Sequence, residues 1–165
     1  FTATEDTLNA EYEIMSQFYN YIQDRGSPRV YYWCADQRFW NKAESRQYDR
    51  LVSEGDDRHE EVSSWQPFEW VDLNSIFMKE TITIKGCFDF KLKSIVSSMN
   101  RHGMISTKLT SDVQDGLTAM LAAKECYANE DSPINSTVMK DIVVYNQFDC
   151  RALYDIVQYL RVKHT

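Results

Sequence analysis

The sequence has few of the residues that mark fibrous, disordered or disulfide-rich chains. Its 165 residues include only 5 Gly, 3 Pro and 4 Cys, which excludes a collagen-like repeat, a low-complexity linker and a disulfide miniprotein. It also lacks an uninterrupted apolar run of roughly 18 residues, the length needed to span a membrane, and a secretory signal at its start. We therefore expect an intracellular protein, cytoplasmic or viral, that is not secreted and has no membrane partner.

Basic residues are scarce as well. Lys and Arg total 18 against 25 Asp and Glu, for a formal net charge of -7. Non-specific binding to phosphates comes mostly from Lys and Arg that displace counterions, so this balance argues against a strongly basic nucleic-acid surface. It is compatible with a metal-dependent enzyme that has acidic site residues. The cysteines form no CxxC pair and have no His at ligand spacing, so we expect four unrelated buried thiols and no zinc site.

Apolar residues at helical spacing are the strongest pattern that is present. Hydrophobic residues make up 43% of the chain, enough for one domain with a core. The spacing predicts helices before Gly26, from about Asp36 to Ser53, around 92–99, around 113–121 and from about Ser136 to Arg161. Residues 54–66 read as a charged loop.

Two short runs rich in aromatic and β-branched residues separate the first helices. Arg29–Cys34 and Pro67–Leu73 are each typical of a short buried strand. A strand, a helix and a second strand predict a parallel pair joined by a crossover. The expected fold class is therefore α/β and helix-rich, with a short parallel sheet near 29–34 and 68–72. Asp72 would end the second strand and cap a small helix that runs to about Met78.

Acidic residues stand at two positions where chemistry is expected. Asp36 follows the first strand, and functional groups gather at the carboxyl ends of parallel strands; simple capping of the next helix is the alternative. Asp149 interrupts the apolar face of the last helix, one turn after Tyr145. Its carboxylate would either bond a tyrosine hydroxyl or Arg151, or bind a hard cation while Tyr145 orients a water molecule.

The order of these pieces resembles a known family. Asp36, Trp70–Leu73, Lys91–Ile95 and Tyr145–Cys150 follow one another as in the tyrosine-type DEDD exonucleases of the RNase H-like superfamily. The likeness is greatest to the predicted nuclease domains of RecB-type nucleases and large DNA viruses.

The resemblance implies a metal-dependent 3'-5' exonuclease acting on single-stranded DNA or RNA ends with two Mg²⁺ or Mn²⁺ ions. Asp36, Tyr145 and Asp149 would be catalytic, with Asp36 and Asp149 as metal ligands. Lys91 and Lys93 would contact nucleic acid.

One departure from the family concerns its first motif. The family opens with a strand of the form Asp-x-Glu, and no such strand fits before Glu11. Residues 1–165 therefore look like a single RNase H-like domain shortened at its N-terminus, with a partial fold. We expect this chain alone to be inactive and to self-associate through the open strand edge near 29–34.

A non-catalytic module that binds nucleic acid or protein is the alternative function. The DNA upstream of the Phe1 codon would discriminate the two, because an in-frame Asp-x-Glu strand there would favour the enzyme.

Overall fold

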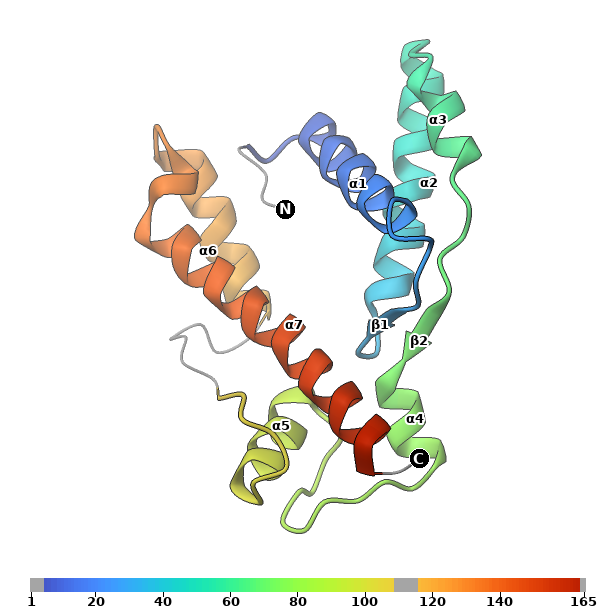
Figure 1. Cartoon of the computed structure of the whole chain (residues 1–165). Coiled ribbons are helices and arrows are strands. Elements are labelled where there is room, and N and C mark those ends of the chain that lie inside the picture. The colour runs from blue at the N-terminus through green and yellow to red at the C-terminus, as the bar shows by residue number, and fades with distance from the viewer. Residues whose placement is uncertain (1–4, 109–115, 164–165) are drawn as a thin grey trace. The chain divides into compact units, whose positions relative to one another are not determined.

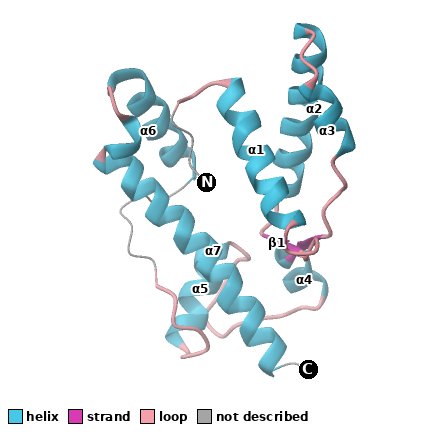
Figure 2. Ribbon diagram, turned by 45° about the horizontal axis from the view of Figure 1, so that its top comes forward, coloured by secondary structure: helices cyan, strands magenta, loops and turns pink. Residues whose placement is uncertain are grey.

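The protein is a helix-rich α/β chain, described here from a computed structural model for residues 5–108 and 116–163 (Figures 1 and 2). It divides into two compact units, Asp6–Leu73 and Asn74–Thr165. The first unit contains α1 (Leu8–Gln23), β1 (Val30–Tyr32), α2 (Asp36–Glu54), α3 (Arg58–Ser64) and β2 (Trp70–Asp72). α4 (Leu73–Lys79) starts at the boundary, and the second unit continues with α5 (Leu92–Arg101), α6 (Gly116–Asn129), the 3-10 turn η1 (Pro133–Asn135) and α7 (Thr137–Lys163).

The predicted parallel pair is confirmed. β1 and β2 run parallel, with Val30 opposite Trp70 and Tyr32 opposite Asp72. α2 and α3 form the connection between the strands, as a parallel pair requires. The two strands therefore end at the same edge of the sheet.

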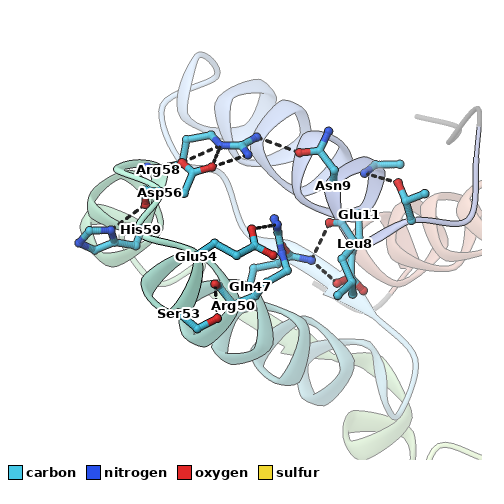
Figure 3. Close-up of polar contacts among 12 residues, drawn as sticks. Leu8, Asn9, Glu11, Gln47, Arg50, Ser53, Glu54, Asp56, Arg58 and His59 are labelled. Atoms are coloured by element: carbon cyan, nitrogen blue, oxygen red, sulfur yellow. Dashed lines mark hydrogen bonds and ion pairs between the residues drawn. The ribbon is translucent and has the colours of Figure 1, made fainter.

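A buried glutamine joins the start of α1 to α2 (Figure 3). Gln47 is fully buried, and its Nε2 donates to Leu8 O at 2.9 Å and to a Glu11 carboxylate oxygen at 2.5 Å. Its Oε1 accepts from Arg50 Nε at 3.1 Å and Nη2 at 3.0 Å. Every polar atom of this side chain is thus paired, as burial demands. The apolar core beside it consists of Tyr12, Met15, Leu51, Val62 and Trp65.

The prediction of a loop over residues 54–66 was wrong, because α3 occupies Arg58–Ser64. Val62 is its one buried residue, so no apolar periodicity reveals the helix in the sequence. Polar contacts hold its start. The Asp56 carboxylate accepts from the Arg58 amide at 3.0 Å and from the Arg58 guanidinium, which lowers the pKa of Asp56 to about 2.

The second unit is built from packed helices. α7 contacts α5, α6 and η1, and a small core of Ala119, Cys126, Met139 and Ile142 lies between α6 and α7. The sequence had placed Val113, Leu117, Met120 and Leu121 on one helix. Val113 lies outside the described residues. The other three are exposed, because α6 packs through its smaller residues.

Two further observations bear on the sequence predictions. All four cysteines are free, but Cys34 and Cys150 are exposed and only Cys126 is fully buried. The prediction that all four thiols are buried was therefore wrong. Among the described residues, none of the helices has the length and apolar character needed to cross a bilayer.

Candidate functional site

Two carboxylates lie at the shared end of the parallel strands. Asp72 is the last residue of β2, and Asp36 is the first residue of α2, shortly after β1. The Cys34 amide donates to Asp72 Oδ1 at 3.1 Å, and the Trp33 amide faces Asp36 Oδ2 at 3.5 Å. Cys34 has a φ of 78°, which is uncommon for a residue other than glycine. This turn directs the chain from β1 into α2 and bonds it to the end of β2.

The negative charge of Asp72 affects the ionisation of Asp36. Partial burial raises the pKa of Asp36, the Trp33 amide opposes that shift, and the negative charge of Asp72 adds to it. The pKa of Tyr32 is raised by burial and then by Asp72, Asp36 and Cys34. The end of the sheet is therefore a region of negative potential. Such a region favours a cation with oxygen ligands.

The structure does not support the alternative role of Asp36, capping of α2. Ala35 occupies the N-cap position of α2, and no side chain caps it. The Asp36 carboxylate instead turns back toward the Trp33 amide. Capping therefore does not occupy this carboxylate. Asp36 is also accessible to solvent.

Asp72 is a site residue that the sequence reasoning missed. The sequence placed it at the end of the second strand and as a helix cap, without a role in the site, whereas its carboxylate joins the two strand ends by accepting from the Cys34 amide. The signal was present, because Asp72 ends its strand and Asp36 comes shortly after the first one. A parallel pair brings both ends to one edge.

In the second unit, two predicted residues meet. Lys93 Nζ lies 4.6 Å from the centroid of the Tyr145 ring, a distance at which a cation is attracted by the face of the ring. Lys93 is in the first turn of α5, and Tyr145 is buried on α7. Asp149 follows one turn later on α7 and is half-buried. Lys91 is exposed, and its amide donates to Asp89 Oδ1 at 2.9 Å.

Arg151, one candidate partner of Asp149, makes its ion pair with Asp155, with Nε 3.2 Å from Oδ1. Asp155 also accepts from Thr107 Oγ1 at 2.5 Å. Arg151 further lies over the Tyr154 ring, with Cζ 5.2 Å from its centroid. The hydrogen bond from Thr107 thus fastens α7 to the segment after α5.

The capacity of the chain for metal ions depends on few side chains. Within each unit, the described residues include no group of three or more His, Cys, Asp and Glu side chains placed to hold one ion. Asp36 and Asp72 supply two carboxylates. Mg²⁺ is commonly bound by one or two carboxylates and keeps several waters, so the pair fits one such ion.

Trp40, Trp65 and Trp70 form a packed cluster with neighbouring aromatic rings. Trp65 stacks on Tyr19 with the ring centroids 5.1 Å apart, and Trp40 lies 5.0 Å from Phe68. Trp65 is 8% exposed, and Trp40 and Trp70 are half-buried. Trp65 therefore belongs to the core, and Trp40 packs against it.

Comparisons of the chain with protein-family models, with curated proteins and with solved structures found no match. Functional conclusions therefore rest on the residues and geometry of the chain itself.

Proposed function

We propose that this chain carries part of the site of a metal-dependent 3'-5' exonuclease that hydrolyses nucleic-acid phosphodiesters. The observation that carries the proposal is the placement of Asp36 and Asp72 at the ends of two adjacent parallel strands, both bonded to the turn at Trp33 and Cys34. In parallel sheets this edge is where functional groups gather. The parallel pair with its helical crossover also supports an RNase H-like fold as part of the proposal.

Each residue has a specific role in this proposal. Asp36 and Asp72 bind Mg²⁺ or Mn²⁺. When bound, the ion polarises the phosphodiester and activates a water molecule. The resemblance to the exonuclease family further implies that Asp149, on α7 of the second unit, is a metal ligand and that the Tyr145 hydroxyl orients a water molecule. Lys93, fixed against the Tyr145 ring, and Lys91 bind phosphate groups of the substrate strand.

Metal binding by the purified chain tests the proposal. Mn²⁺ affinity is measured by electron paramagnetic resonance on the wild type, on Asp36→Asn and on Asp72→Asn. We expect each substitution to weaken binding at least tenfold, because one of two carboxylate ligands is lost. Asp24→Asn, at the exposed C-terminal end of α1, is the control and should leave the affinity unchanged. Equal affinity in all four proteins would contradict the proposal.

Hydrolysis is measured separately, with an end-labelled single-stranded oligonucleotide and either Mg²⁺ or Mn²⁺. Two ions about 3.5 to 4 Å apart require bridging carboxylates, and the pair in the first unit supports one ion. We therefore expect the chain alone to release no nucleotide. Release that depends on metal and disappears in Asp149→Ala would refute this expected inactivity while supporting the nuclease assignment.

A further inference from the structure

A polar groove follows α2 away from the end of β1. Its volume is about 750 Å³, and its walls include Tyr32 and Cys34 at one end and one face of α2 along its length. Three cationic side chains, Arg38, Lys42 and Arg46, line it against one carboxylate, Asp49. The groove is thus locally positive on a chain whose net charge is -7.

The three cations are arranged in a row. They occur at every fourth position of α2, so they share one face of the helix. Each cationic residue lies about 6 Å along the helix axis from the next one in the row. All three are exposed. A row of this kind presents positive charge along a line, which suits an extended polyanion better than a single small anion.

Two of these charges form no ion pair with the described residues. In the first unit the other ion pairs are Arg29 with Glu69, Arg50 with Glu54 and Arg58 with Asp56, and Arg46 itself pairs with Glu11. Within residues 5–108 and 116–163, neither Arg38 nor Lys42 forms an ion pair. These two side chains are therefore available to an external anion without breaking an internal ion pair.

The strand end of the groove and an exposed aromatic ring beside Arg38 suggest what the anion is. At its strand end lies Cys34, whose amide binds Asp72, so the groove starts beside the carboxylate pair. Phe39, 60% exposed, stands next to Arg38, whose Cζ lies 5.7 Å from the ring centroid. Cationic grooves that follow the backbone, with aromatic rings on which bases stack, are the usual means of binding single strands.

We propose that this groove binds the phosphodiester backbone of a single-stranded nucleic acid, with Arg38 and Lys42 on phosphates and Phe39 against a base. The substrate class rests on the proposed function, but the binding itself does not require a metal ion. It can therefore be tested where hydrolysis is impossible.

The experiment is a fluorescence anisotropy titration of the full chain with labelled single-stranded DNA and RNA of one sequence, in EDTA and over a series of salt concentrations. We expect the double variant Arg38→Ala/Lys42→Ala to bind at least tenfold more weakly. Each phosphate contact on a single strand contributes about 0.7 to the slope of log affinity against log salt. The slope of the double variant should therefore be shallower by about 1.4.

A second pair of lysines provides the matched control. Lys124→Ala/Lys140→Ala removes the same charge from exposed positions on α6 and α7 and should change affinity less than twofold. The single variant Lys42→Gln, expected to reduce the slope by about 0.7, serves if the double variant fails to fold by circular dichroism.

The outcomes separate the groove from the proposed function. If Arg38→Ala/Lys42→Ala binds the oligonucleotide as tightly as the wild type, or if the lysine control loses as much affinity, the groove is not the binding site. Either result leaves the nuclease proposal standing. Displacement of the oligonucleotide by polyglutamate at the same charge concentration, or no binding by the wild type, also overturns it. Binding that depends on the groove, together with no Mn²⁺ binding at Asp36, supports the groove and favours the non-catalytic module over the nuclease.

Discussion

The carboxylate of Asp36 lies in an environment that disfavours its charge. Burial and the neighbouring Asp72 both raise its pKa above the ordinary value of 3.8. The folded protein then holds this proton more tightly than the unfolded chain does. The contribution of Asp36 to the stability of the fold therefore falls as the pH rises from about 3.8 through the raised pKa, and the loss persists at neutral pH.

We accordingly expect Asp36→Asn to unfold at a higher temperature than the wild type at pH 7 and at nearly the same temperature at pH 3, because the amide cannot ionise. Thermal melts followed by circular dichroism over this pH range measure the difference, with Asp24→Asn as the control. A melting temperature for Asp36→Asn below that of the wild type at pH 7 would contradict the charge argument. Mn²⁺ added to the wild type should reduce the gap.

At the scale of secondary structure, α1 and α3 are fastened by a hydrogen bond from Tyr12 to a carboxylate. The hydroxyl donates to Glu61 Oε2 at 2.6 Å, and burial together with Glu61 raises the pKa of Tyr12 to about 12. Arg58 also lies over the Tyr12 ring, with Cζ 4.8 Å from its centroid. A bond from a buried tyrosine to a charged group contributes about 1.5 to 3 kcal/mol.

We expect Tyr12→Phe to lower the free energy of unfolding by about 1.5 to 3 kcal/mol, measured by urea denaturation at pH 7. Because the phenyl ring stays in the core, the lost free energy of unfolding measures the contribution of the hydroxyl group. Tyr48→Phe, 40% exposed on α2, serves as the matched control and should change stability by less than about 0.5 kcal/mol. Similar losses in the two variants would show that the bond to Glu61 is not what joins these helices.

The elements differ in how far the sequence could predict them. α1, α2, α5 and α7 have repeated apolar residues, and Gly26 and Gly103, with φ of 76° and 68°, end helices where expected. The strands were found because aromatic and β-branched residues cluster in them. α3 was missed because its start is fixed by the Asp56 and Arg58 contacts and a single residue, Val62, anchors it.

Only part of the candidate site could be predicted from the sequence, because some of its contacts join segments that are far apart in the chain. Asp36 could be found from its position after a strand, whereas the role of Asp72 depends on the register that sets Tyr32 opposite it. The contact of Lys93 with the Tyr145 ring depends on how α5 packs on α7. Such relations between distant segments have no local signature in a single sequence.

For the whole molecule, the small sheet raises the question of association. In the part of the chain that the structure describes, the sheet consists of β1 and β2 alone. Sheets of two strands are only marginally stable by themselves, and strand edges readily pair with another chain. Because the Val30 amide donates to Glu69 O at 2.9 Å, the backbone groups of Tyr31 face the opposite edge of β1.

We expect the chain to self-associate along this edge, so that its mass by light scattering increases with concentration. Tyr31→Pro removes the amide on that edge and leaves the pairing with β2 intact, and it should shift the mass toward the monomer. A wild type that stays strictly monomeric at high concentration would rule out this mode of association.

The long connection between the strands also has a consequence for the order of folding. Cys34 and Asp72, which are hydrogen-bonded, are 38 residues apart in the chain, with α2 and α3 between them. Contacts over such separations form late, because closing the intervening loop costs entropy before the contact compensates for it. The two carboxylates would thus become neighbours only in the final steps of folding. An ion bound by both would stabilise the completed first unit and none of its precursors.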